Sequence, residues 1–279
     1  MPAVLAAGRR HSVACRADGT AIAAGDGRAG ECDVVDWSGL IAVAAGNVHS
    51  APNTGRSHTV GLRVDGTVVA TGWDSDGQGN VSRWSEIVAV AAGWRTTLGL
   101  LADGTTVSTG RTAEGQCEVR AWTGVVSIAG GDWHSVAVRS DGTALAAGNN
   151  QRGQCSIGGW RNLVGISAGY LHTAGLRGDG TVAATGDNSW GQCDVDQWSC
   201  VTEIAAGSVH TVALGEDGRV HAVGDNRFRQ CEVQAWTGVT AIAAGSAHTL
   251  GLLADGTVVS AGSNDNQQCD VGTWQLHRR

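Results

Sequence analysis

The sequence contains no lysine, and its 279 residues include only two prolines, one tyrosine and one phenylalanine. All 19 basic residues are arginines and the net charge is −7, so the chain lacks the overall basic field that nucleic-acid binding requires. No run of 18 apolar residues is present, which predicts that nothing crosses a membrane. No C-x-x-C pair occurs, and we expect neither a metal site nor a cofactor.

Glycine, in contrast, is abundant, and 43 glycines with so little proline predict many tight turns rather than disorder. An Asp-Gly pair returns once after 47 residues and then five times after 38 residues. It begins at Asp18, Asp65, Asp103, Asp141, Asp179, Asp217 and Asp255. A framework tryptophan keeps the same steps at Trp37, Trp84, Trp122, Trp160, Trp198, Trp236 and Trp274. Seven copies of a 38-residue repeat therefore cover residues 1–279, which we interpret as a single domain.

Each repeat divides at its turns into four short segments, as residues 201–236 illustrate. These are "VTEIAAG", "HTVALGE", "RVHAVG" and "CEVQAW", and the Asp-Gly pair between the second and third is typical of a β-hairpin. No segment has helical periodicity. Seven repeats of four short antiparallel strands predict an all-β fold, a seven-bladed β-propeller with four strands per blade.

The repeated pattern "HTVAL..DG.V.A.G.N..GQC" resembles the repeat of the regulator-of-chromosome-condensation propellers over the full length of the chain. The 38-residue unit is closer to compact bacterial members, such as the propeller-type β-lactamase inhibitor proteins, than to the eukaryotic unit. This resemblance implies the propeller fold. It implies no particular activity, because the family includes GTPase exchange factors, enzyme inhibitors and uncharacterised scaffolds.

The single step of 47 residues comes from an insertion at residues 47–58, where three residues of the other repeats become twelve. Antiparallel strands alternate in direction, so the loops after the first and third strands of each blade share one face, which we call the loop face. Six aromatic residues outside the framework fall in these loops. They are Trp73, Trp94, Trp133, Tyr170, Trp190 and Phe228. Departures from a repeat are where function is expected, which directs attention to this face.

Aromatic and arginine side chains presented on rigid strands are typical of a recognition surface. The first hypothesis is therefore a binding module that docks a protein or peptide on the loop face around blades 2–4. Its predicted binding residues are the six aromatic residues together with Arg56 and Arg95.

The alternative hypothesis is an enzyme of small-molecule metabolism, such as a natural-product cyclase or alkylating enzyme, with its active site at the channel mouth on the same face. Histidine can act as a general base near neutral pH, a carboxylate can orient it, and arginine can hold an oxyanion. The candidate catalytic residues are His49, His58, Glu114, Asp132, Arg95 and Arg111. No Ser-His-Asp order, phosphate loop or metal motif selects a reaction, so a small-molecule ligand stays open beside a protein partner.

Six cysteines share one slot of the repeat, and equivalent residues of neighbouring blades are too far apart for a disulfide. Reduced thiols, and an N-terminus without the charge order of a secretory signal, predict a cytoplasmic protein, which we expect to be a monomer. A histidine follows a signature glycine by three residues in most blades, and we expect each to bond to the backbone of its own blade. These are His11, His134, His172, His210 and His248.

Overall fold

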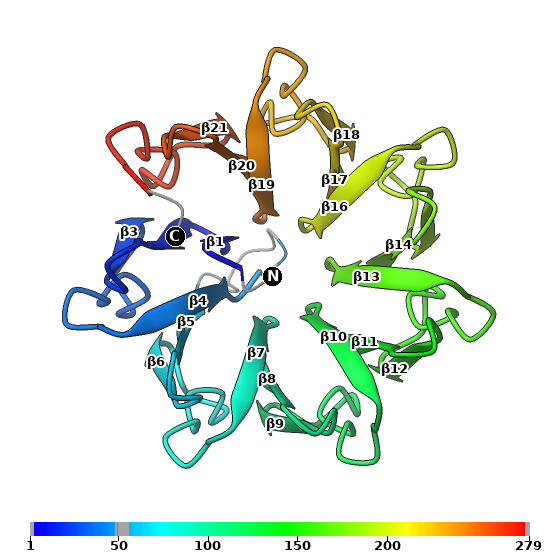
Figure 1. Cartoon of the computed structure of the whole chain (residues 1–279), viewed down its shortest axis with the longest axis horizontal. Helices are drawn as coiled ribbons and strands as arrows, with labels where there is room; N and C mark the ends of the chain where they lie inside the picture. The colour runs from blue at the N-terminus through cyan, green and yellow to red at the C-terminus, as the bar shows by residue number, and fades with distance from the viewer. Residues whose placement is uncertain (1–2, 48, 50–55, 277–279) are drawn as a thin grey trace.

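The computed structural model describes residues 3–47, 49 and 56–276 of the chain. These residues form seven antiparallel three-stranded sheets, arranged around a central axis as the blades of a propeller (Figure 1). Within each sheet the strand order follows the chain, and the first strand lies nearest the axis. Within the described residues, no helix has the length and apolar character needed to cross a bilayer.

The blades follow one another in sequence. Blades 1 to 3 consist of β1 Leu5–Ala7, β2 His11–Cys15 and β3 Ala21–Gly25; β4 Leu40–Ala45, β5 His58–Arg63 and β6 Val68–Gly72; β7 Ile87–Ala92, β8 Thr96–Leu101 and β9 Thr106–Gly110. Blades 4 and 5 consist of β10 Val125–Gly130, β11 His134–Arg139 and β12 Ala144–Gly148; β13 Leu163–Ala168, β14 His172–Arg177 and β15 Val182–Gly186. Blades 6 and 7 consist of β16 Val201–Ala206, β17 His210–Gly215 and β18 Val220–Gly224; β19 Val239–Ala244, β20 His248–Leu253 and β21 Val258–Gly262.

The core of the propeller lies between adjacent blades. The middle strand of blade 1 is buried at every position, and those of blades 2–7 are buried at every position except the last. These strands are buried because a neighbouring blade covers each of their faces. Framework tryptophans pack into these interfaces, and Trp37 lies against Gly61, where a side chain would collide with the indole. Glycine in the middle strands therefore leaves space for the tryptophan that packs between two blades.

The predicted fourth strand is wrong, and each blade has three strands. The segment that ends at Trp236 folds through successive turns, in which Val233 N–H donates to Cys231 O and Trp236 N–H donates to Val233 O. Its backbone donors are used locally and form no ladder with β18. Val233 of this segment is fully buried in the core between two blades. The alternation of apolar residues in its sequence therefore does not mark a half-buried strand.

Where the ring closes, the described C-terminal residues form an isolated bridge and no strand of their own, and they lie at the start of the inner strand of blade 1. Leu276 N–H donates to Gly256 O at 2.6 Å, which repeats the bond from Leu40 N–H to Gly19 O that begins the next blade. The buried Leu276 side chain packs in one cluster with Leu5 of β1 and Leu250 of β20. The C-terminal segment thus supplies the position that Leu40 supplies to blade 2, and β1 supplies the rest of the inner strand.

Candidate functional site

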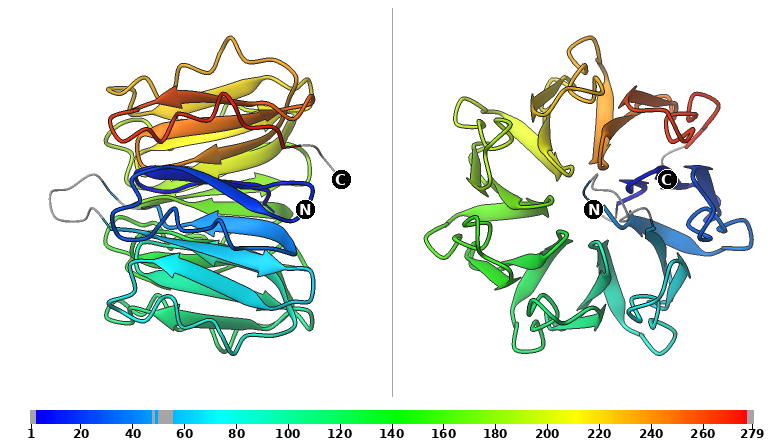
Figure 2. Two further views of the ribbon diagram at one scale, coloured as in Figure 1. Left: turned by 90° about the vertical axis from the view of Figure 1, so that its left-hand side faces the viewer. Right: turned by 180° about the vertical axis from the view of Figure 1, so that it is seen from behind.

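The strands run between two opposite faces of the ring, as the side view in Figure 2 shows. Loops after the inner strands and after the third strands lie on the loop face, because the strands of each blade alternate in direction. The Asp-Gly turns between the second and third strands lie on the other face, which we call the turn face. The loop face therefore collects the residues that depart from the repeat.

A buried histidine at the start of the middle strand joins six of the blades to the next blade. Its Nε2 lies 2.8–3.0 Å from a hydroxyl oxygen of the neighbour. Each hydroxyl donates its own hydrogen to a backbone carbonyl, as Thr211 does to Gln192 O at 2.7 Å, so it accepts from the histidine Nε2–H. The pairs are His11–Thr59, His58–Thr97, His134–Thr173, His172–Thr211, His210–Thr249 and His248–Ser12.

This arrangement corrects two predictions. The histidines bond to the next blade and not to the backbone of their own blade, because the signature glycine lets each ring lie beneath the inner strand and reach across the interface. His58, a candidate base, is such a framework residue; it is 1% exposed, and burial lowers its pKa from 6.5 to about 3. A neutral, enclosed imidazole that already donates to Thr97 is unsuited to abstract a proton from a ligand.

The series of bonds between blades is interrupted once, between blades 3 and 4. Thr96 stands where the other blades have histidine, and Ser135 stands where the acceptor hydroxyl is expected. Both residues are fully buried, and neither hydroxyl oxygen has a hydrogen-bond partner among the residues that the structure describes. The loops that lead into these two middle strands carry Trp94 and Trp133. The missing histidine bond and the aromatic loops therefore lie in the same part of the ring.

Three aromatic side chains of blades 3, 4 and 5 meet around His49 on the loop face. The His49 ring is stacked on Tyr170 at 4.4 Å between centroids, and it meets the edge of Trp94 at 5.3 Å. Trp133 lies 6.1 Å from His49 and packs edge-to-face with Trp94 at 4.6 Å. We call these four residues the aromatic cluster. Trp94 is buried within it, whereas Trp133 and Tyr170 are half-buried.

Asp132 fixes the position of His49. Both the backbone N–H and Nδ1 of His49 bond to the same carboxylate oxygen of Asp132, at 2.8 and 2.7 Å. Burial raises the pKa of Asp132, and the hydrogen bonds from His49 oppose that shift. A residue of blade 2 is thereby tied to blade 4, 83 residues further along the chain.

Asn47 extends from the same insertion toward the opposite side of the ring. Its side-chain amide donates to Ala206 O of blade 6 at 3.3 Å, and its carbonyl oxygen lies 3.1 Å from the hydroxyl of Ser246 in blade 7. Asn47 and His49 together contact blades 3 to 7, so these two residues of blade 2 reach the far side of the ring on the loop face. Of the remaining insertion residues, 48 and 50–55 lie outside the described residues.

Two arginines beside the cluster are stacked on tryptophan and paired with a carboxylate. The guanidinium of Arg95 lies 4.0 Å from the Trp94 ring centre and 4.5 Å from that of Trp73, and its NH1 is 3.3 Å from Asp76. Arg111 forms two hydrogen bonds with Glu114, of 2.8 and 2.6 Å, and its guanidinium lies 5.7 Å from the Trp133 ring centre. These hydrogen bonds from Arg111 hold the pKa of Glu114 below its ordinary value.

Asp76 was not among the candidates, although it pairs with Arg95. Its sequence context, "DSDG", matches only part of a calcium-binding loop, and no spacing rule relates residue 76 to residue 95. In the described residues, no group of three or more His, Cys, Asp or Glu side chains could hold a metal ion. Asp76 is therefore placed by the structure as a partner of an arginine.

The remaining predicted binding residues lie further round the ring. Trp190 and Phe228 follow the third strands of blades 5 and 6 and are 46% and 42% exposed. The guanidinium of Arg227 lies 4.1 Å from the Trp190 ring centre and is bonded to Asp225 at 2.9 Å. Arg56, at the end of the insertion, is exposed. The structure thus brings together Trp73, Trp94, Arg95, Trp133 and Tyr170 and leaves Trp190 and Phe228 as a second, more exposed patch.

The seven sheets, built from copies of one short repeat, form a seven-bladed β-propeller. The model of the regulator of chromosome condensation (RCC1) repeat matches residues 53–78, 125–154, 163–192, 201–230 and 239–268, more than half of the chain. The chain therefore belongs to the RCC1-repeat family. Among curated proteins, no sequence matches it.

Solved structures with the same fold include eukaryotic propellers. Prp20p from Saccharomyces cerevisiae, described with its binding to Gsp1p and histones, has 18% identity and a TM-score of 0.67 over 85% of this chain and 74% of its own. Human WBSCR16 has 18% identity and a TM-score of 0.68, over 89% of this chain and 86% of its own. The ectodomain of the Arabidopsis thaliana receptor kinase ACR4 has 20% identity and a TM-score of 0.65, over 80% and 85%. At these sequence identities, the similarity to the solved structures shows a shared fold and nothing more.

Proposed function

We propose that the chain is a protein- or peptide-binding module whose partner docks on the loop face over blades 3–5. The observation that carries this proposal is the packing of Trp133, Tyr170 and Trp94 around His49, flanked by Arg95 and Arg111. Aromatic residues and arginine are the residue types on which binding free energy concentrates. Because stacking and ion pairs already hold these side chains, little conformational entropy is lost when a partner docks.

The comparisons agree with this proposal at the level of the fold. Prp20p is a propeller with the same repeat, and its solved structures are described with the proteins Gsp1p, histones and Kap60. Those partners belong to Prp20p. For this chain, mixed arginine–carboxylate pairs on the loop face favour a folded protein or peptide over nucleic acid, since the guanidinium groups of Arg95 and Arg111 are already paired with carboxylates.

The test compares capture of partners by the native protein and by single variants. Trp133→Ala removes a half-buried ring of the aromatic cluster, Trp190→Ala removes an exposed ring of the second patch, and Val64→Ala changes a residue on the turn face that is 72% exposed. We expect Trp133→Ala to weaken the dissociation constant of a captured partner by about tenfold or more, roughly 1.4 kcal/mol. Val64→Ala should bind as the native protein does, and equal binding by all three variants would remove the loop face from consideration.

A second candidate function, an enzyme acting on a small molecule, is favoured by the 2.7 Å contact between His49 and Asp132. A carboxylate bonded to Nδ1 orients an imidazole as it does in many general bases. Asp132→Asn keeps the shape of this pair and removes its charge. If the native protein consumes a metabolite of its source extract, the variant should slow that reaction at least a hundredfold. Capture of a protein partner without turnover of any metabolite would reject the enzyme hypothesis.

The proposal places the protein in the cytoplasm as a monomer. All eight cysteines are free thiols, and burial raises the pKa of several of them, for example that of Cys155 to about 11. Such thiols suit a reducing compartment. Cell fractionation and light scattering of the purified protein test the two statements separately.

A further inference from the structure

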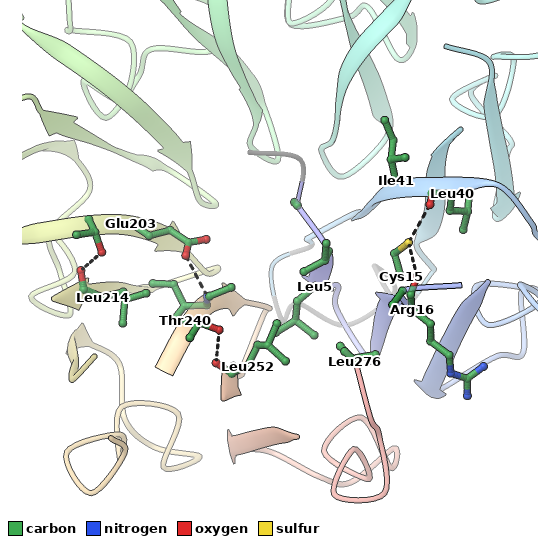
Figure 3. Close-up of a pocket in the computed structure, with 16 residues that line it drawn as sticks. Leu5, Cys15, Arg16, Leu40, Ile41, Glu203, Leu214, Thr240, Leu252 and Leu276 are labelled. Carbon is green, nitrogen blue, oxygen red and sulfur yellow. Dashed lines mark hydrogen bonds between the residues drawn. The ribbon is translucent and has the colours of Figure 1, made fainter. Parts of the chain in front are cut away.

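The two faces of the ring differ in the side chains that they present. On the turn face, all seven aspartates of the Asp-Gly turns are exposed. The pocket of about 550 Å³ on that face has a mainly aliphatic lining, which includes Leu5, Leu252 and Leu276 (Figure 3). On the loop face, the exposed side chains include Trp190, Phe228 and several arginines. Because part of the negative charge lies on the turn face, the net charge of −7 does not predict the charge that the loop face presents.

Arginine and aromatic side chains alternate on the loop face over blades 4, 5 and 6, which follow one another round the ring (Figure 1). Arg152, Trp190 and Phe228 occupy the same position of the loop after the third strand. The backbone N–H of each donates to the side-chain oxygen of a buried glutamine two residues later, at 2.9–3.0 Å. Arg227 connects the two aromatic residues, because it precedes Phe228 and stacks on Trp190 at 4.1 Å, and Arg229 follows Phe228. We call these five residues the arginine–aromatic strip.

Blades 2 and 3 have carboxylates at this loop position. Asp76 pairs there with Arg95 at 3.3 Å, and Glu114 pairs with Arg111 at 2.6 Å. The backbone N–H groups of both acids bond to a glutamine two residues later, as in blades 4–6, so the loops are alike and their side chains differ. The position is therefore neutralised within the chain in blades 2 and 3, whereas in blades 4–6 it presents arginine or an aromatic ring.

The arginines of the strip are more exposed than the carboxylates that hold them. Asp225 accepts two hydrogen bonds from Arg227, of 2.9 and 3.0 Å, and its side chain is 3% exposed whereas that of Arg227 is 56% exposed. The side chain of Arg229 is 78% exposed, and that of its partner Glu232 is 49% exposed. The guanidinium of Arg152 forms no hydrogen bond or ion pair within the described part of the chain. A docking partner therefore meets guanidinium groups before it meets carboxylates.

Arg229 stands where five other blades have glycine. The φ angles of those glycines are 78–89°, and that of Arg229 is 69°, in the left-handed region that a residue with a side chain adopts at a cost in stability. The glycines are Gly30, Gly77, Gly115, Gly153 and Gly191. Stability therefore does not explain this arginine. Such a departure from the repeat is expected where the surface is used.

We propose that the segment of the partner that docks on the arginine–aromatic strip is an acidic peptide with apolar side chains among its carboxylates. This inference rests on the binding function proposed for the loop face and adds the chemistry of the partner. The carboxylates pair with Arg152, Arg227 and Arg229, and the apolar side chains pack on Trp190 and Phe228. Bonds between guanidinium and carboxylate groups are charge-assisted and directional, so they fix the orientation of the peptide. The loops already hold both aromatic residues, which reduces the entropy lost on docking.

The experiment measures binding of a fluorescent peptide, Glu-Glu-Leu-Leu-Glu-Glu-Phe-Phe-Glu-Glu, by anisotropy. Acidic and apolar side chains alternate along each side of this peptide when it is extended. The comparison probes are the same peptide with glutamine or with lysine in place of every glutamate, and a single strand of ten thymidines. We expect the acidic peptide to bind saturably, the glutamine peptide to bind about tenfold more weakly or less, and the lysine peptide and the DNA not to bind. Affinity for the acidic peptide should fall as the salt concentration rises from about 50 to about 500 mM.

Two pairs of arginine substitutions test the strip itself. Arg152→Gln/Arg229→Gln removes two exposed charges of the strip and should weaken the acidic peptide by about tenfold or more. Gln267 in blade 7 has a φ of 66° at the position of Arg229, so glutamine is compatible with this backbone. Arg83→Gln/Arg120→Gln is the matched control, because it removes two exposed arginines outside the loop face and should bind as the native protein does.

The same variants, applied to a captured partner, separate this proposal from the function on which it rests. A partner that is lost by Trp133→Ala and retained by Arg152→Gln/Arg229→Gln would leave the binding module intact and overturn the acidic peptide. The proposal is also overturned if the acidic peptide does not bind, if the glutamine peptide binds as tightly, or if the DNA binds more tightly than the peptide. Equal affinities of the two double variants for the acidic peptide would overturn it as well.

Discussion

At the scale of single residues, the most informative position is Thr96. Six blades join their neighbour through histidine. Between blades 3 and 4, the buried hydroxyls of Thr96 and Ser135 have no hydrogen-bond partner within the described part of the chain. An unsatisfied buried polar group costs about 1–3 kcal/mol. His248 shows that a serine is a sufficient acceptor, because its Nε2 lies 3.0 Å from the Ser12 hydroxyl. The interruption thus lowers stability just where the loops are least regular.

We predict that Thr96→His raises the free energy of unfolding by about 1 kcal/mol or more, since it restores the bond to Ser135. Urea unfolding at neutral pH measures the change. Thr96→Val is the control; it removes the unpaired hydroxyl without adding a bond and should be close to neutral. A marked loss of stability in Thr96→His would mean that Trp94 and Trp133 pack into the space that the imidazole needs.

At the scale of the elements, the sequence predicts the repeat, the blades and the face on which the irregular loops lie. It does not predict contacts between blades, because spacing within one repeat carries no information about the neighbouring repeat. The bond of His172 therefore seemed local, although it reaches Thr211 in the next blade. For the same reason the sequence left open which candidate histidine is oriented by which candidate carboxylate. The structure pairs His49 with Asp132. Alternation alone also could not separate a strand from the turns around Val233.

The buried histidines at the starts of the middle strands make stability depend on pH. Burial lowers their pKa from 6.5 to about 3 or 4, so the unfolded chain binds more protons between those values. Stability is therefore complete above about pH 6.5 and falls as the pH drops toward 4, by about 1.4 kcal/mol per pH unit for each histidine. Urea midpoints at several pH values between 7.5 and 4.5 should decrease steeply over this range.

The turn carboxylates do not obscure this window. The turn aspartates, such as Asp179, have a pKa lowered below 3.8 by the hydrogen bond from Thr181, so they lose their contribution only at lower pH. Replacing the exposed His221 by glutamine should leave the profile unchanged, whereas replacing the buried His210 should reduce its slope and the stability at pH 7. Equal midpoints at pH 7 and pH 5 in the native protein would contradict the buried, neutral state of these imidazoles.

At the scale of the whole molecule, the ring depends on contacts between its two ends. Blade 7 meets blade 1 through the bond of Ser246 N–H to Gly8 O and through Leu276, which is 2% exposed. Leu276→Ala should lower the free energy of unfolding by about 2–4 kcal/mol, the usual cost of such a cavity. Leu40→Ala, the corresponding change in blade 2, should cost a similar amount, because the two leucines are equally buried and make equivalent backbone bonds.

The two variants should differ in where the protein opens. Among the described residues, no continuous segment connects a strand of blade 7 to a strand of blade 1, so loss of the Leu276 side chain allows these blades to separate, whereas blades 1 and 2 stay joined by the chain when Leu40 is truncated. Hydrogen exchange followed by mass spectrometry should therefore show faster exchange in β1, β2 and β20 of Leu276→Ala than in the rest of the ring. Uniform exchange around the ring in Leu276→Ala would mean that closure is shared equally by all seven interfaces.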